Sequence, residues 1–233
     1  MSPIAELRRR VYLGAERRYI EVTDEVVHRL EYELSIIEAK HFASYFLIMD
    51  EIVALASRSC GRGSGAASIV SYALGITGVD PIAHNLYFER FLSPGRTDPP
   101  DIDVDFAWDE RPRIFEAIQD RYGEDRIGRV ANHIFYRRRS ALRECARAWG
   151  QNDRAINRFL EGADSPDPDW KTIRSIADAL AGLPKEIGTH SGGIIITPKP
   201  IVSYAPITRT GDGYPLLVWE KDGCELAGFV KLD

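Results

Sequence analysis

The stretch PPDIDVDF, residues 99–106, places an aspartate at every second position between two prolines and a phenylalanine. In a strand, side chains alternate between the two faces, so Asp101, Asp103 and Asp105 would share one face while the apolar residues pack on the other. Neighbouring carboxylates on that face would lie roughly 6–7 Å apart. Such a row of like charges lowers stability unless a positive charge lies between them.

Two interpretations explain this aspartate row. It can be the acidic solvent face of an exposed edge strand, although such faces usually mix Lys, Thr and Ser. It can instead bind Mg²⁺, which takes one or two carboxylates together with phosphate oxygens and water. Two ions about 3.5–4 Å apart are typical of phosphoryl transfer. The spacing favours a metal site, but it does not decide which two of the three aspartates bind.

A second segment, GRGSGAAS at residues 61–68, favours phosphate binding. Its glycines, Gly63 among them, permit a positive φ and let a ligand approach the backbone. Ser64 or Ser68 can cap the next helix, whose first N–H groups would face an anion, and Arg62 adds positive charge. The segment lacks the lysine and the spacing of a Walker A loop, and it can also be a helix–helix turn built for close packing.

The net charge of −5 conceals an uneven distribution. Six acids and no base lie from Asp98 to Glu110, and six arginines and no acid lie from Arg126 to Arg143. Of the 30 basic residues 24 are arginines, whose planar side chain makes two-pronged contacts with phosphate. A cation-binding stretch close in sequence to a polyanion-binding stretch indicates chemistry on nucleotides.

Single arginines and one histidine add further candidates. Arg137 and the two arginines after it form either a solvated turn or a contact to a phosphate backbone. Arg90, between the aromatic residues of FERF, is expected to be half-buried and to need an anionic partner such as Glu89 or a substrate phosphate. His190, in THSGG, belongs to a turn before a strand or touches substrate. At the end of the chain, FVKLD offers a further acid, Asp233, on the same strand face as a lysine.

Apolar periodicity predicts an α+β (mixed) fold. Helices are expected over 1–22, from a Thr23 cap, over 42–58, over 66–76, from Asp109 to Tyr122, over 140–150, and in two pieces within 151–185. Strands are expected over 101–106, 129–136, 192–197, 215–220 and 226–233. The stretch GADSPDPDW, residues 162–170, is typical of a linker, and a small helical insert is expected between 134 and 186.

In this order, the segments resemble the C-family bacterial DNA polymerases, that is, the DNA polymerase III alpha subunit of the replicative or error-prone type. The motifs GRGS, FERFL, PDxDxD and VKxD follow one another as in that family, and the likeness covers nearly the whole chain except 151–180. The resemblance implies a polymerase-beta-like nucleotidyltransferase palm with an inserted helical thumb. The implied parts are an N-terminal helical part of the palm (1–60), a palm part with the phosphate turn and the aspartate strand (61–133), the thumb (134–186) and a palm β segment (187–233).

The resemblance also implies roles for single residues. Asp101, Asp103 and Asp233 would be the catalytic acids that hold two Mg²⁺ ions, and Asp105 would be a neighbour. The incoming nucleotide would be bound by Arg62, Gly63, Ser64, Arg90 and Lys231. The DNA backbone would be bound by Arg137, Arg138, Arg139 and Arg143. The implied reaction is attack of a primer 3′-hydroxyl on the α-phosphate of a deoxynucleoside triphosphate (dNTP), with release of pyrophosphate.

The implied partners are primer–template DNA and a dNTP, and in full-length family members also a sliding clamp and other replisome or repair subunits. The sequence has no run of 18 apolar residues, so no membrane partner is expected. The expected location is cytoplasmic and nucleoid-associated. Family members are much longer, so we expect a palm–thumb fragment with weak or no activity alone. Between EIVALASR and GRGS relatives usually carry a few more residues, which make a short strand. This chain has only SC there, and the shortening is expected to affect the geometry of the phosphate turn. The alternatives are a catalytically inactive DNA- or partner-binding remnant and a template-independent nucleotidyltransferase.

Overall fold

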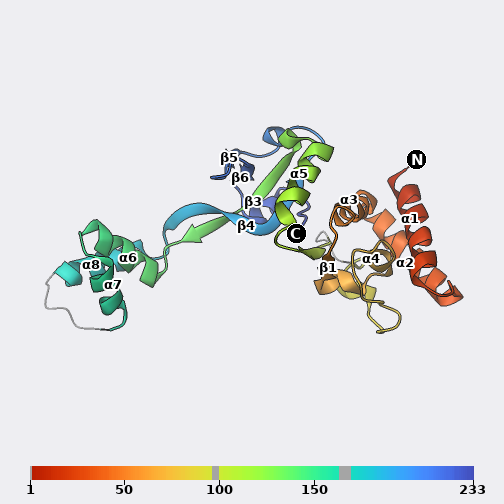
Figure 1. Cartoon of the computed structure of the whole chain (residues 1–233), viewed down its shortest axis with the longest axis horizontal. Helices are drawn as coiled ribbons and strands as arrows, with labels where there is room; N and C mark the ends of the chain where they lie inside the picture. The colour runs from red at the N-terminus through yellow and green to blue at the C-terminus, as the bar shows by residue number, and fades with distance from the viewer. Residues whose placement is uncertain (1, 96–99, 163–168) are drawn as a thin grey trace. The chain divides into compact units, whose positions relative to one another are not determined.

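The computed structural model describes residues 2–95, 100–162 and 169–233, and it is a mixed α+β protein, as predicted (Figure 1). The chain divides into two compact units, the first made of residues 1–130 and 191–233 and the second of residues 131–190. Most of the predicted linker at 162–170 lies outside the described residues. Within the described part, every helix is too short or too polar to cross a bilayer.

The first unit begins with a helical part. Its helices are α1 (Pro3–Arg18), α2 (Asp24–Ala39), α3 (Ala43–Val53) and α4 (Ile69–Ala73). Thr23 caps α2 by accepting a hydrogen bond from the Val26 N–H, as its sequence predicts. Helix α1 packs against the other three, and the core between them contains the edge-to-face aromatic side chains of Phe46, Phe88 and Phe91.

The described residues form two sheets, and the strands β3 and β4 of one of them extend into the second unit. Strands β1 (Ser59–Arg62) and β2 (Asp103–Phe106) form an antiparallel pair. The other sheet has the order β4-β3-β6-β5, with β3 and β6 parallel and β5 and β6 antiparallel. Its strands are β3 (Ile127–Phe135), β4 (Pro184–Ile196), β5 (Ile207–Arg209) and β6 (Pro215–Leu217). The remaining elements are α5 (Arg111–Tyr122), α9 (Lys221–Leu226) and the short 3₁₀ turns η1 (Gly63–Ala67), η2 (Phe88–Arg90), η3 (Glu124–Arg126) and η4 (Ile201–Ser203).

The described residues of the second unit, 131–162 and 169–190, form three helices and the adjoining ends of β3 and β4. The helices are α6 (Arg138–Ala148), α7 (Asp153–Leu160) and α8 (Asp169–Leu180). They enclose a core of their own that includes Ala141, Ile156 and Ile173, and the rings of Phe159 and Trp170 stack with their centroids 4.0 Å apart. A separate core is what allows such a unit to be stable in its own right.

Two predictions for the end of the chain are wrong. The segment 226–233 is not a strand: α9 occupies 221–226, and only Leu232 pairs, as an isolated bridge with Ile194. Helix α9 buries the side chain of Cys224, and the Lys221–Glu225 pair four residues apart adds a small stabilisation. The THSGG segment, for which one expectation was a turn before the strand at 192–197, instead lies within β4, which covers residues 184–196.

The predicted helices around GRGS are too long. Helix α3 ends at Val53 rather than residue 58, and the predicted helix at 66–76 is reduced to α4, preceded by the 3₁₀ turn η1. The intervening residues 59–62 form β1 because they pair with β2. The short strand before the glycine turn is therefore present.

Candidate active site

The pairing of β1 with β2 places the glycine turn directly beside the aspartates. Arg62 lies opposite Asp103, and Gly61 lies opposite Val104. The apolar residues of the aspartate stretch are buried, Ile102 to 1% and Val104 to 6% exposure, so the aspartates point to the other face. The alternation predicted from the sequence is confirmed over this segment.

Three carboxylates converge at this place. Each of Asp101, Asp103 and Asp233 offers an oxygen, and these oxygens all lie within 4.8 Å of one another. All three residues are half-buried, whereas Asp105 is exposed and its Oδ2 lies 3.0 Å from the Arg62 Nε. Oxygen ligands at this separation suit a hard divalent cation such as Mg²⁺, so the donor set fits the metal that the sequence implies.

Asp233 is held by hydrogen bonds on two sides. Its carbonyl oxygen accepts a hydrogen bond of 3.0 Å from the Val104 N–H on β2. The preceding residue, Leu232, exchanges two backbone hydrogen bonds of 2.9 and 3.0 Å with Ile194 on β4. A Cβ atom at Gly192 would lie 2.9 Å from Asp233 Oδ1, so a side chain there would force this carboxylate to shift.

The protein itself supplies positive charge to the acids. Lys231, which is buried, donates to Asp233, and its Nζ lies 3.9 Å from Asp101 Oδ1. The Arg62 guanidinium lies 3.2 Å from Asp103 Oδ2. The sequence did not reveal Lys221, whose Nζ lies 3.9 Å from Asp101 Oδ2, because its part in the site depends on where α9 lies.

The environment of Asp103 disfavours its charge. Partial burial and the neighbouring Asp101 raise the pKa of the Asp103 carboxyl, while Arg62 opposes the rise. Behind it, the buried Tyr45 accepts a hydrogen bond of 3.1 Å from the Ile102 N–H, and burial raises the pKa of this phenol. Closely spaced acids with little solvent form a place where a cation binds favourably.

The glycine turn approaches the same acids. Gly63 has φ +70°, and a Cβ there would lie 3.3 Å from Asp103 Oδ2. Ser68, not Ser64, caps α4 by accepting a hydrogen bond from the Ser71 N–H. The N–H groups of Ile69 and Val70 donate to the Glu33 carboxylate. The expectation that the first N–H groups of this helix face a ligand anion is therefore wrong, because Glu33 is their anion.

Sequence reasoning missed Glu33, although the sequence contains a signal for it. Helix α2 buries Val26, Leu30, Leu34 and Ile37, and Glu33 falls within that apolar face. An acid at such a position is buried and requires partners.

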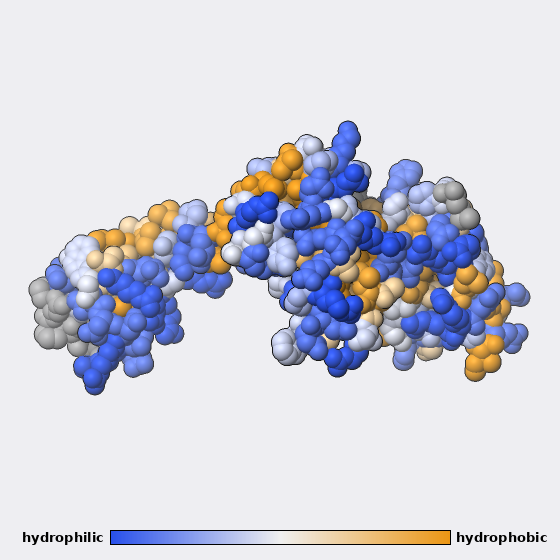
Figure 2. Space-filling view, turned by 45° about the horizontal axis from the view of Figure 1, so that its top comes forward, coloured by the Kyte–Doolittle hydropathy of each residue, from blue (hydrophilic) through white to orange (hydrophobic). Residues whose placement is uncertain are grey.

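The remaining candidates are placed as follows. Arg90 is exposed rather than half-buried, and Glu89 accepts a hydrogen bond of 2.6 Å from the Tyr32 hydroxyl. The arginines 137–139 are exposed where α6 begins, and the visible face of the α6–α8 part is largely hydrophilic (Figure 2). Arg143 donates a hydrogen bond of 2.9 Å to Asn157 Oδ1. His190 lies within β4, at the end of the second unit.

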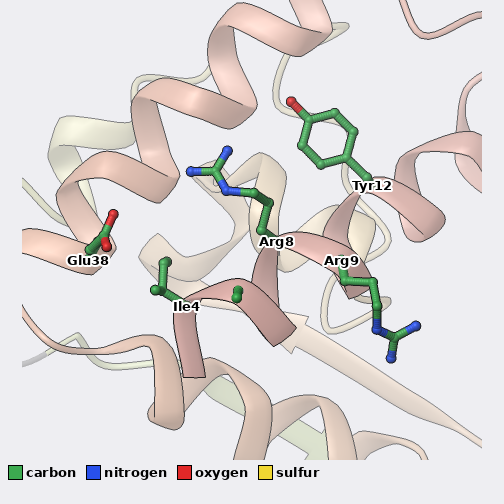
Figure 3. A pocket seen from close by; sticks show the side chains of 6 residues that line it. Ile4, Arg8, Arg9, Tyr12 and Glu38 are labelled. Atoms are coloured by element: carbon green, nitrogen blue, oxygen red, sulfur yellow. The ribbon is translucent and has the colours of Figure 1, made fainter. Parts of the chain in front are cut away.

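A separate hollow of about 350 Å³ lies along α1 and α2 and is lined by Ile4, Ala5, Arg8, Arg9, Tyr12 and Glu38 (Figure 3). Arg8 and Tyr12 both contact Glu31, and Arg9 pairs with Glu6. None of the lining residues belongs to the acidic cluster or to the glycine turn, so this hollow is not part of the candidate active site.

The sequence matches the family described as "Bacterial DNA polymerase III alpha NTPase domain" over residues 5–233. The chain therefore belongs to this family of bacterial DNA polymerase III alpha proteins. Similar proteins include the error-prone DNA polymerases of Nocardia farcinica (41% identical, over 97% of this chain and 21% of the relative) and Mycolicibacterium paratuberculosis (40%, over 97% and 22%). The error-prone DNA polymerase of Bdellovibrio bacteriovorus is 35% identical over 100% of this chain and 24% of its own length. The chain thus spans about a fifth to a quarter of the relatives it matches.

Proposed function

We propose that this chain is a polymerase-beta-like palm with an inserted thumb, the part of a DNA-directed DNA polymerase that transfers a nucleotide from a dNTP to a primer 3′-hydroxyl. The observation that carries the proposal is the meeting of Asp101, Asp103 and Asp233 beside the Arg62–Gly63 turn. The family match and the names of the relatives supply the polymerase class.

Each residue of the site has a proposed part. Asp101, Asp103 and Asp233 would hold two Mg²⁺ ions, which supply charge neutralisation and activation of the attacking oxygen when bound. The open backbone at Gly63 and Ser64 would accept the triphosphate. Arg62 and Lys231, which pair with the acids, would turn to the phosphates as the acids bind metal. Arg90, exposed on η2, would add charge at the outer phosphates.

The basic segment of the second unit would bind primer–template DNA. Arg137, Arg138 and Arg139 are exposed, and no acid lies in the first turn of α6 to neutralise them. Positive charge at a helix N-terminus is unfavourable without an anion, and a DNA backbone would supply one. Arg143 would join them on exchanging its Asn157 contact for a phosphate. A sliding clamp and the other replisome or repair subunits stay predictions for the longer relatives.

One observation favours an alternative, a catalytically inactive DNA-binding piece. Lys231, Lys221 and Arg62 already contact the three acids, so the cluster is neutralised in part without any metal. A metal must then displace these cations, which weakens its binding. Weak metal binding would also fit a fragment with low activity of its own.

Extension of a primed template tests the proposal. The chain, Mg²⁺ and four dNTPs should extend the primer according to the template, slowly but above background. Asp101→Asn combined with Asp103→Asn should abolish extension, and Asp105→Asn should retain it. Addition without a template would favour a template-independent transferase. DNA binding without any extension at high protein concentration would favour the inactive DNA-binding piece.

A further inference from the structure

A buried ion pair lies behind the glycine turn. Glu33 is fully buried, and the Nε of Arg29, one helical turn earlier on α2, lies 2.7 Å from Glu33 Oε1. The carboxylate also accepts hydrogen bonds from Ser68 Oγ (2.7 Å), the Ile69 N–H (3.1 Å) and the Val70 N–H (3.3 Å). All four partners are donors, so both oxygens are satisfied in the ionised state.

The pair joins two segments far apart in the sequence. The Nη2 of the Arg29 guanidinium donates to the Ala67 carbonyl (3.0 Å) at the end of η1 and to the Leu86 carbonyl (2.9 Å) just before η2. The neighbouring Tyr32 hydroxyl donates to Glu89 Oε1 within η2. One face of α2 therefore fixes both the glycine turn and the FERF turn.

Core stability alone does not require this arrangement. Apolar residues of similar volume often replace a buried ion pair at no cost in stability. What an apolar pair could not provide is the set of directed hydrogen bonds that fix two turns at once, because dispersion contacts have no such direction. Both turns carry residues proposed to bind the nucleotide, namely Gly63 and Ser64 on one and Arg90 on the other.

We infer that Arg29 and Glu33 are positioning residues, which hold the η1 turn and the η2 turn at the fixed separation that a nucleoside triphosphate requires. The pair acts through these two turns and touches neither substrate nor metal. The inference rests on the proposed function in one respect, the identity of the ligand; the coupling of the two turns stands on the hydrogen bonds alone.

Arg29→Lys tests the inference in the 233-residue chain. A lysine keeps the charge beside Glu33, but its single nitrogen cannot occupy the positions of both Nε, which contacts Glu33, and Nη2, which donates to the two carbonyls. In calorimetric titrations, the Kd for dATP in the presence of Mg²⁺ should rise about five- to tenfold, while the Kd for Mg²⁺ alone should change less than about twofold. A purely structural role would move the two constants together or not at all, and either result would overturn the inference. If the lysine variant does not fold, Glu33→Gln serves instead, because it removes the buried charge. It should likewise raise the Kd for dATP and leave the Kd for Mg²⁺ nearly unchanged.

Hydrogen exchange separates this inference from the proposed function. The amides of residues 63–70 and 86–91 should both exchange faster in Arg29→Lys than in wild type. Arg8→Lys, which alters a more exposed arginine–glutamate contact between α1 and α2, should change neither segment. If the wild-type chain binds no dATP, the proposed function fails, and the exchange result alone decides the positioning role. Unchanged exchange in either segment would contradict it.

Discussion

At the scale of single residues, the candidate site depends on the absence of side chains as much as on the acids. Gly63 combines φ +70° with a position where a Cβ would lie 3.3 Å from Asp103 Oδ2. Gly192 leaves room for Asp233 in the same way. A methyl group at either position would crowd a carboxylate oxygen of the acidic cluster, Asp103 Oδ2 or Asp233 Oδ1.

Gly63→Ala is therefore expected to impair both stability and metal binding. The left-handed backbone should cost about 1–2 kcal/mol in the free energy of unfolding, measured by urea denaturation. The Kd for Mg²⁺ should also rise, because Asp103 has to move. Gly213→Ala is the matched control: Gly213 has φ +88° but no neighbouring atom within 4 Å of its Cβ position, so only stability should fall. Equal Mg²⁺ affinity in both variants would contradict the account.

Asp103→Asn should change how stability depends on pH when Mg²⁺ is absent. The folded state raises the pKa of Asp103 above its ordinary value of 3.8, so folded protein holds this proton more tightly than unfolded protein does. Wild type consequently loses stability as the pH rises from about 4 through the raised pKa, and the asparagine variant does not. In urea unfolding with a chelator present, the free energy of unfolding of the variant should rise relative to that of wild type between about pH 4 and pH 7. A constant difference across that range would refute the raised pKa.

At the scale of elements, two helix caps of similar chemistry make different numbers of hydrogen bonds. Thr23 caps α2 at the surface, accepting one hydrogen bond from Val26 N–H. Ser68 caps α4 and is fully buried, and its hydroxyl also donates to Glu33. The second cap therefore belongs to the network that supports the glycine turn.

Ser68→Ala is expected to destabilise the chain more than Thr23→Ala does. Loss of the Thr23 cap should cost about 1 kcal/mol. Loss of Ser68 should cost about 2–3 kcal/mol, because the buried Glu33 also loses a donor. Urea denaturation of both variants measures the difference; equal losses would mean that the Ser68–Glu33 hydrogen bond adds nothing.

The sequence predicted those elements whose signals are local. The Thr23 cap, the helix end at Tyr122 and the alternation at 101–106 all depend on neighbouring residues, and all are found. The bounds of β1 and the bridge of Leu232 depend on pairing partners far away in the chain, which periodicity cannot supply. Contacts between distant parts of the chain also limited the prediction of the site. Asp233 was assigned by family resemblance, and Lys221 became visible only when distant elements met. The burial of Glu33 could have been read from the apolar face of α2, but its partners on the glycine turn could not.

At the scale of the whole molecule, the described chain consists of two units with separate cores, and each carries one part of the proposed function. The first unit contains the acidic cluster, and the second contains the exposed arginines 137–139. The net charge of −5 therefore says little about DNA binding, because the basic charge is local.

Replacement of Arg137, Arg138 and Arg139 by alanine should weaken DNA binding and make it less sensitive to salt. If each arginine contacts one phosphate, the slope of log K against log salt should become less steep by about 2.7. Fluorescence anisotropy with duplex DNA at several salt concentrations measures this slope. Arg17→Ala, an exposed arginine on α1, should leave it unchanged. An unaltered slope in the triple variant would remove these arginines from the DNA contact.

Asp101, Asp103 and Asp233 should together bind a divalent cation, and calorimetric titration with Mg²⁺ measures this binding. Wild type and Asp105→Asn should bind with similar affinity, because Asp105 lies on the same stretch but outside the cluster. Asp101→Asn combined with Asp103→Asn should bind at least about tenfold more weakly. Mg²⁺ binding that survives the double substitution, or that is lost equally in Asp105→Asn, would contradict the account.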